Sequence, residues 1–175
     1  MKKYILVVCG PLCSGKTTVV DLLLKTEARL FRVSRDKIKR FISDYGPNNY
    51  YKPLLDEIQI SLIRQAFTNN LNVVVEGSPN IYDDMKQSLV KLSKEFNTKL
   101  IEINLEAPLE ILTDRFRERI KEAEKKGIKL FCTTEERMLD LYNKYISEKD
   151  VSTHLILTDV KTLDEVYNEI KSKIT

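Results

Sequence analysis

Gly10-Pro11-Leu12-Cys13-Ser14-Gly15-Lys16-Thr17 decides the fold of this chain, because it matches the pattern G-x-x-x-x-G-K-S/T at every position. Residues 4–9, just before it, form a short apolar run of β-prone residues, and residues 18–25, just after it, suit a helix. The pattern is expected between a buried strand and a helix start, so its flanks support the match. The alternative, a glycine-rich turn that binds no nucleotide, leaves this context unexplained.

The residue types in this stretch are those that a phosphate-binding loop needs. Gly10 and Gly15 let the backbone curl so that its N–H groups converge, and the positive end of the next helix faces the same point. In this motif the lysine, Lys16, reaches the β- and γ-phosphates, and the hydroxyl of Thr17 ligates Mg²⁺. The predicted contacts to ATP come from Gly10, Leu12, Cys13, Ser14, Gly15, Lys16, Thr17 and Thr18.

Length and composition indicate one globular domain. The chain has 175 residues, of which 42% are hydrophobic and 31% charged, and its net charge of +3 only weakly favours an acidic partner. No run of about 18 apolar residues predicts a transmembrane helix. The apolar run after Met1-Lys2-Lys3 leads into the loop and not into a cleavage site, which argues against a signal peptide.

The cysteines and the histidine predict no metal site. Cys9, Cys13 and Cys132 show no C-x-x-C spacing, which fits a reducing compartment, and we expect a cytoplasmic protein with no membrane partner. Cys13 lies within the loop and is open to modification, but nothing assigns it a catalytic role. His154 opens an apolar run, where a structural role is favoured over catalysis.

Strand and helix signals alternate along the whole chain. After the first strand and helix, strands are expected at 30–33, 71–76, 99–105 and 154–157, and helices at 35–43, 52–68, 82–95 and 108–126. Thr133 with Glu136, and Thr162 with Glu165, have the spacing of capping boxes for two further helices. This order predicts an α/β fold with a five-stranded parallel sheet and helices on both of its faces.

Two carboxylates follow expected strands, where ligands bind in open parallel sheets. Asp36 is the candidate general base that activates an attacking hydroxyl, and the alternative is an ordinary first-turn acid that stabilises a helix dipole. Glu76 ends the run Val73-Val74-Val75 and is the candidate partner of Thr17 in holding Mg²⁺. The alternative for Glu76 is a strand-end residue turned to solvent.

Two sets of basic residues complete the candidate site. Arg115 and Arg119 are four positions apart on an expected helix, so at least one of them is a candidate for neutralising charge on a transferred phosphoryl group. A solvated, salt-bridged helix face is the alternative. A second set mixes cations and aromatic rings, which suits either a nucleic-acid strand or a solvated face beside core aromatics. Its members are Lys37, Lys39, Arg40, Phe41, Tyr45, Tyr50, Tyr51 and Lys52.

These motifs, taken in chain order, resemble P-loop kinases of the polynucleotide-kinase and zeta-toxin type, an AAA-type ATP-binding family. The resemblance rests on the loop 10–17, Ser34-Arg35-Asp36 with a base three positions on, Val75-Glu76-Gly77, and the Arg115/Arg119 pair. It covers most of the chain. It implies one domain over 1–175, a three-layer fold like that of nucleoside-monophosphate kinases, and a small mobile lid at about 115–133.

The resemblance also implies individual roles. Asp36 takes the place of the acid–base aspartate, Lys39 that of a phosphate-binding arginine, and Arg119 that of the lid arginine nearer the transferred phosphate. The adenine is expected near Arg115 and residues 158–161. Two positions depart from the family pattern: Lys39 lacks the bidentate geometry of arginine, although Arg40 is adjacent, and Glu76 stands where aspartate is more usual.

The sequence therefore predicts an ATP- and Mg²⁺-dependent kinase. Its acceptor is a hydroxyl, either the 5′ end of a polynucleotide or a small molecule such as a metabolite, nucleoside or nucleotide. A nucleotide-binding regulatory ATPase or switch is the alternative from another class. The predicted acceptor contacts are Asp36, Lys39, Arg40 and Glu76.

Overall fold

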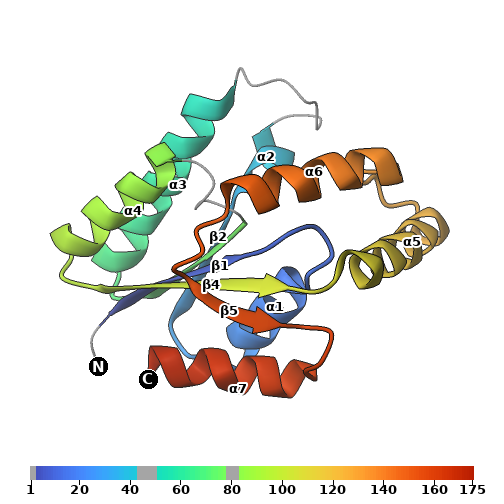
Figure 1. Cartoon of the computed structure of the whole chain (residues 1–175). Helices are drawn as coiled ribbons and strands as arrows, with labels where there is room; N and C mark the ends of the chain where they lie inside the picture. The colour runs from blue at the N-terminus through green and yellow to red at the C-terminus, as the bar shows by residue number, and fades with distance from the viewer. Residues whose placement is uncertain (1–2, 43–50, 78–82) are drawn as a thin grey trace.

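Five parallel strands form a sheet in the order β2-β3-β1-β4-β5, in a computed structural model that describes residues 3–42, 51–77 and 83–175. The strands are β1 Tyr4–Cys9, β2 Leu30–Ser34, β3 Asn72–Glu76, β4 Lys99–Glu106 and β5 His154–Leu157 (Figure 1). The helices are α1 Lys16–Thr26, α2 Arg35–Ile42, α3 Lys52–Thr68, α4 Asp83–Glu95, α5 Leu109–Lys126, α6 Glu135–Glu148 and α7 Leu163–Ile174. The predicted α/β fold is confirmed.

β1 lies at the centre of the sheet, and all of its residues are buried. Helices cover both faces here, so both alternating sets of side chains are apolar and the strand reads as a continuous apolar run. The register places Val8 opposite Glu76 of β3 and Cys9 opposite Asn104 of β4. The carboxyl end of β1, where the loop begins, therefore lies between the ends of β3 and β4.

The two faces of the sheet have separate apolar cores. On one face α1 and α7 pack against side chains such as Leu6 and Val8, and on the other α3 and α4 pack against Ile5 and Val7. Figure 1 shows these two pairs of helices on opposite sides of the strands. The one-residue alternation along β1 thus decides which helices each side chain meets.

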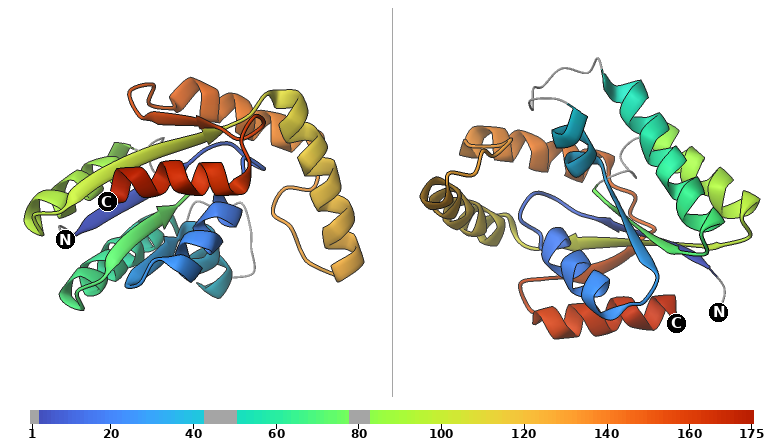
Figure 2. Two further views of the ribbon diagram at one scale, coloured as in Figure 1. Left: turned by 90° about the horizontal axis from the view of Figure 1, so that it is seen from below. Right: turned by 180° about the vertical axis from the view of Figure 1, so that it is seen from behind.

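α5 projects beyond the carboxyl ends of the strands, and α6 returns from there alongside β4, as Figure 2 shows. They share a third apolar cluster, called here the loop–lid cluster, against which two loop residues, Leu12 and Cys13, also pack. This cluster joins the phosphate loop to the segment predicted to form a lid. Its buried members are Ala107, Leu112, Phe116, Cys132 and Met138.

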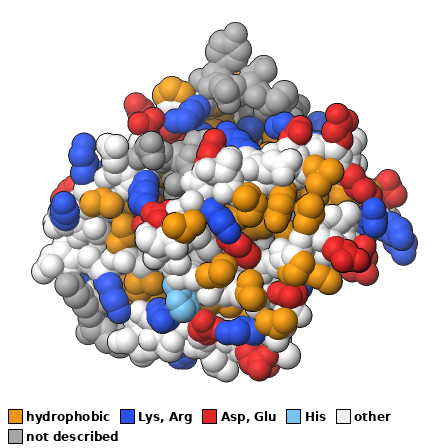
Figure 3. All heavy atoms as spheres, in the orientation of Figure 1, with side chains coloured by type: hydrophobic (Ala, Val, Ile, Leu, Met, Phe, Trp, Pro, Cys, Tyr) orange, Lys and Arg blue, Asp and Glu red, His pale blue; other side chains and the backbone are white. Residues whose placement is uncertain are grey.

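β5 forms one edge of the sheet and is covered on one face only. Ile156 is buried in the core beneath α7, whereas Leu155 and Leu157 on the opposite face are 47% and 43% exposed. Figure 3 shows apolar side chains gathered over β5 and α6 on this face of the molecule. The second face of the sheet is therefore less covered at β5 than at β1.

The helix ends are mostly as expected, with one correction. The Thr162–Glu165 capping box is present, and Gly127 ends α5 in a left-handed conformation. The box predicted from Thr133 and Glu136 is wrong: Thr134 is the cap, and its side chain accepts from the backbone N–H of Arg137 at 3.2 Å. Tyr45 and Tyr50, two of the aromatic residues in the predicted mixed set of cations and rings, lie outside the described residues. No helix in the described ranges is long and apolar enough to span a membrane.

Candidate active site

The two glycines of the loop serve different steric needs. Gly10 has a φ of +145°, and a Cβ there would lie 2.2 Å from the carbonyl oxygen of Leu105 and 2.5 Å from Oγ of Ser14. Gly15 has a φ of +90° just before α1, and a Cβ there would meet no protein atom within 4 Å. Gly10 therefore permits close packing against β4, and the space beside Gly15 is open to a ligand.

Lys16 is held inside the loop by neutral oxygens. Its Nζ donates to the carbonyls of Gly10 at 2.9 Å and Pro11 at 2.6 Å, and lies 3.5 Å from Oγ of Ser14. Burial lowers the pKa of Lys16, and the charges of Cys9, Glu76 and Asp36 oppose that shift. No carboxylate in the described part of the chain forms an ion pair with it. A partly buried ammonium in this setting is a binding site for an anion.

Thr17 and Glu76 form a pair of oxygen donors next to Lys16. Oγ1 of Thr17 donates to Oε1 of Glu76 at 2.5 Å, and Glu76 is only 8% exposed at the end of β3. The other oxygen of Glu76 has no hydrogen bond among the described residues, although Nε of Arg32 lies 3.3 Å away. A hydroxyl beside a buried carboxylate with an unused oxygen fits the oxygen ligands that Mg²⁺ prefers.

Asp36 lies in the first turn of α2, directly after β2, and its side chain is exposed. Its charge acts on Lys16, so the carboxylate lies on the loop side of the sheet edge. The preceding residue, Arg35, pairs with Asp56 of α3 at 2.5 Å, and Lys52 pairs with the same carboxylate at 3.0 Å. The Arg35–Asp56 pair anchors the start of α2 to α3 and so positions Asp36, and the Lys52–Asp56 pair within α3 adds to the charge around that carboxylate.

A cavity of about 310 Å³ opens beside the loop, between α1, α5 and the segment after β5. Its volume is at the lower end of the range of small-molecule sites, and its walls combine apolar side chains with a few polar groups. Three predicted loop contacts, Cys13, Gly15 and Thr18, line it. The lining residues are Cys13, Gly15, Thr18, Val19, Leu105, Arg115, Thr158, Lys161, Leu163 and Val166.

Arg115 forms one wall of this cavity and Arg119 does not. The guanidinium of Arg115 donates to the hydroxyl of Thr158 at 3.0 Å and to its carbonyl at 2.7 Å. The N–H of Thr158 in turn donates to the carbonyl of Glu106 at 2.8 Å, which extends the β4–β5 ladder. Arg119, one turn further along α5, is exposed. The structure thus separates the two predicted arginines by environment.

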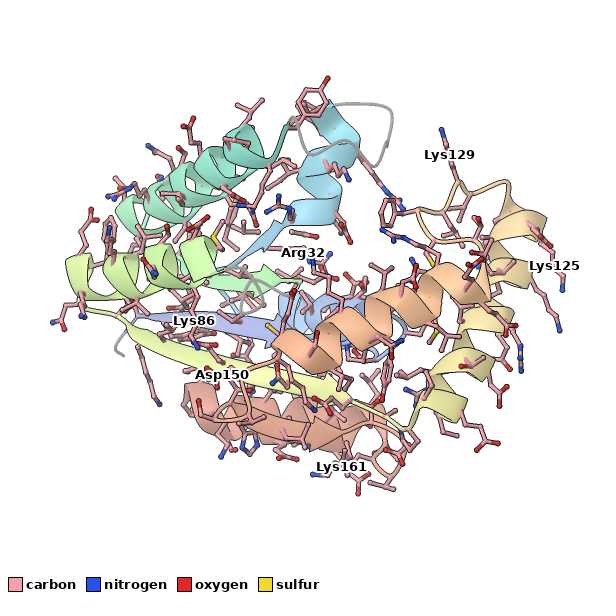
Figure 4. The ribbon with its side chains drawn as sticks, turned by 45° about the horizontal axis from the view of Figure 1, so that its top comes forward. Arg32, Lys86, Lys125, Lys129, Asp150 and Lys161 are labelled. Atoms are coloured by element: carbon pink, nitrogen blue, oxygen red, sulfur yellow. The ribbon has the colours of Figure 1, made fainter. Side chains whose placement is uncertain are left out.

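The predicted acceptor residues Lys39 and Arg40 lie on α2, facing the loop that follows α5. Nζ of Lys39 lies 5.0 Å from the centroid of the Phe131 ring, so α2 and this loop are neighbours. Arg40 is exposed. Figure 4 shows α2 and the loop after α5 facing each other.

Two charged residues at the site were not predicted individually. Arg32, in the middle of β2, pairs with Asp21 at 2.5 Å as well as approaching Glu76. The sequence signal for Arg32 was its position as a charged residue within a largely apolar strand. Lys161 lines the cavity and pairs with Glu169 of α7, which also bonds His154 at 2.7 Å. His154 is thus in a structural ion-pair network, away from the loop.

Comparisons with known proteins agree with this geometry. A family model described as an AAA domain matches residues 5–139. L-seryl-tRNA(Sec) kinase of Methanococcus maripaludis is 33% identical over 89 residues, which are 51% of this chain and 29% of that protein. The chain therefore spans less than a third of the length of this curated relative.

Two solved structures share the fold at low identity. APS kinase of Mycobacterium tuberculosis, determined with AMPPNP and APS, has a TM-score of 0.66 at 14% identity, over 98% of this chain and 96% of that one. A chain of the Pnkp1/Rnl/Hen1 RNA repair complex has a TM-score of 0.65 at 19% identity, over 85% of this chain and 47% of that one. The sheet and its helices therefore have the architecture of P-loop kinases.

Proposed function

This chain belongs to the AAA domain family, and on that basis we propose that it transfers the γ-phosphate of ATP, with Mg²⁺, to a hydroxyl acceptor. The observation that carries the proposal is the convergence of Lys16, the Thr17–Glu76 pair and Asp36 on one loop. A positive group, a metal-ligating pair and an exposed carboxylate are the parts that phosphoryl transfer requires.

The residues around the loop fit ATP and Mg²⁺. Lys16 has only neutral partners, so phosphate oxygens would replace the carbonyls of Gly10 and Pro11 as its acceptors. Thr17 and Glu76 would hold the metal, with the unused oxygen of Glu76 available for it or for one of its water ligands. When bound, Mg²⁺ supplies positive charge to the phosphate oxygens.

The remaining site residues have proposed roles that follow from their positions. Asp36 orients the acceptor hydroxyl and takes up its proton on a carboxylate oxygen. The base of ATP occupies the cavity beside Arg115 and Lys161. Residues 115–133 act as a lid, and Arg119 reaches the transferred phosphate when the lid closes.

For the acceptor we propose the 5′-hydroxyl of a polynucleotide. Two similar proteins support an acceptor that contains nucleic acid: one is named as a kinase of L-seryl-tRNA(Sec), and a chain of an RNA repair complex shares the fold. The basic residues of α2 support it as well, because Lys37 and Arg40, three positions apart on one side of the helix, and Lys39 all follow Asp36 on this short helix. A nucleic-acid backbone needs such cations along its path.

A transfer screen tests the proposal. Wild-type protein is incubated with γ-labelled ATP and Mg²⁺ together with 5′-hydroxyl oligonucleotides, nucleosides or small hydroxylated metabolites. Labelled 5′ ends on the oligonucleotides support the proposal. Label on a small molecule alone shows that the acceptor is that small molecule and not a polynucleotide. ADP release that does not respond to any acceptor contradicts the kinase assignment and favours a regulatory ATPase.

A further inference from the structure

α2 carries more positive charge than its place in the fold requires. Its eight residues include four basic side chains and one acidic side chain, and none of the eight is buried. Arg35 is used to anchor the helix to Asp56, whereas Lys37 and Arg40 are exposed. The outer part of α2 therefore presents cations to solvent instead of an apolar face to the core.

An aromatic ring stands among these cations. Phe41, in the last turn of α2, is 93% exposed, more than any other large apolar side chain in the described part of the chain. An exposed ring beside basic side chains is the arrangement on which proteins stack bases of single-stranded nucleic acids. Burial in the core does not explain Phe41, because the ring contributes almost no buried surface.

The loop after α5 adds residues to this surface on the side of α2 that carries Lys39. Lys39 lies over the ring of Phe131, which brings the loop and α2 together. Two residues before Phe131, Lys129 is exposed, and no described carboxylate forms an ion pair with it. Figure 4 shows Lys129 projecting outward from the loop beside α2, whereas Lys125 projects from α5 away from α2.

The position of this surface relative to the phosphate loop indicates the direction in which a bound strand would run. Asp36 lies at the inner end of α2, where its charge acts on Lys16. Phe41 is five residues further along the helix, a rise of about 7.5 Å. A strand whose end lies at Asp36 would therefore run outward along α2, with Arg40 and Phe41 on one side of its path and, on the Lys39 side of the helix, the loop that carries Lys129.

We propose that this surface binds the body of a single-stranded polynucleotide acceptor, the nucleotides that follow the reacting 5′ end. The inference rests on the proposed function, because it concerns the path of that acceptor. The basic side chains contact successive phosphates, and a base stacks on Phe41. The surface, called here the α2–lid rim, consists of Lys37, Lys39, Arg40, Phe41, Lys129 and Phe131.

The first experiment measures binding of a fluorescent 12-nucleotide strand with a 5′-hydroxyl, as RNA and as DNA of the same sequence. We expect Lys129→Gln to weaken binding about threefold and to reduce the slope of log K against log salt by about 0.7, the value for one lost contact to a single strand. Lys125→Gln, on the same helix–loop segment, is the matched control and should retain the wild-type slope. Equal slopes for both variants would overturn the proposal.

The second experiment compares transfer to the 12-nucleotide strand with transfer to a dinucleotide, which is too short to reach the outer rim. We expect Phe41→Ala to raise KM for the long strand about tenfold more than KM for the dinucleotide, equivalent to about 1.4 kcal/mol. Phe41→Tyr should return KM for the long strand to near its wild-type value, because tyrosine keeps a stacking ring. Equal losses for both acceptors, or no rescue by tyrosine, would overturn the rim.

The two proposals fail in different ways. If wild-type protein phosphorylates a small molecule and neither oligonucleotide, the acceptor in the proposed function is wrong and the rim fails with it. If it phosphorylates both oligonucleotides and the rim variants match wild type, only the rim is wrong. If Phe41→Ala and Lys129→Gln weaken binding of RNA and of DNA by the same factor, the rim is supported and any contact with the 2′-hydroxyl lies elsewhere.

Discussion

Oγ1 of Thr17 donates a hydrogen bond to Oε1 of Glu76 across 2.5 Å, which links the start of α1 to the end of β3. The two residues are 59 positions apart in sequence, and the register of β1 with β3 brings them together. The buried carboxylate is thereby held in place before any metal binds. Both residues are candidate Mg²⁺ ligands from the sequence alone.

Glu76→Gln tests the metal role of this pair. The amide keeps the size of the side chain but removes its charge, so we expect the Mg²⁺ concentration for half-maximal transfer to rise about tenfold, the effect of about 1.4 kcal/mol. Titration of activity with Mg²⁺ at saturating ATP measures it. Glu57→Gln, an exposed acid on α3, is the control, and an unchanged titration for Glu76→Gln would exclude the role.

Lys16→Ala tests the anion site. Removal of one preorganised cation at a developing charge lowers kcat by about 100- to 1,000-fold, so we expect a loss in that range. Steady-state transfer with labelled ATP gives the value. Lys25→Ala, in the last turn of the same helix, should behave as wild type. A loss below tenfold for Lys16→Ala would show that phosphate binding lies elsewhere.

Asp36→Asn separates catalysis from ATP binding. Asparagine occupies the same space but cannot take up the acceptor proton, so transfer should be nearly abolished. Calorimetric affinity for ATP should change by less than about threefold, because the proposed role of this carboxylate is toward the acceptor and not toward ATP. Full turnover by this variant would remove Asp36 from the base role.

Gly10→Ala tests the packing of the loop against β4. The added Cβ would lie 2.2 Å from a backbone oxygen, so the loop must move, at a cost of about 2 kcal/mol. We expect Tm to fall by about 4–8 °C and ATP affinity to fall with it. Gly127→Ala, which has a positive φ but no neighbour within 4 Å, should lower Tm by less.

Asp150→Asn predicts a pH-dependent change in stability. Hydrogen bonds from Lys86 and Ser152 hold the pKa of Asp150 below its usual value, so its stabilisation is present above the unfolded-state pKa of about 3.9 and disappears as pH falls below it. At pH 7 the variant should lose about 1 kcal/mol and about 2–4 °C in Tm. The Tm difference between the variant and wild type should be constant above about pH 5 and shrink progressively as the pH falls below about 4, and a difference that stays constant down to about pH 2 would contradict this origin.

The core of the fold could be predicted because its signals are local. The continuous apolar run of β1 requires burial on both faces. The helical spacing of Leu55, Ile58, Leu62 and Ala66 predicts α3 at its observed bounds, Lys52–Thr68. Thr133 was taken for the cap of α6 because adjacent threonines satisfy the same pattern. Only the backbone conformation distinguishes Thr134 as the residue that reaches the N–H of Arg137.

The site was less predictable where it depends on contacts between distant segments. Spacing showed that Arg115 and Arg119 share a helix side, but not that the segment after β5 meets only Arg115. The approach of Arg32 to Glu76 likewise arises from the pairing of β2 with β3. The placement of Lys39 over Phe131 depends on how far α5 extends before Gly127 turns the chain back.

The loop–lid cluster limits how a closing motion could occur. Leu12 and Cys13 share apolar contacts with the inner half of α5, including Leu112 and Phe116. Swinging all of α5 outward would expose these side chains to water, at about 25 cal/mol for each Å² uncovered. If residues 115–133 act as a lid, we therefore expect the pivot to lie beyond Phe116, with the inner turns of α5 staying packed on the phosphate loop while the outer turns move.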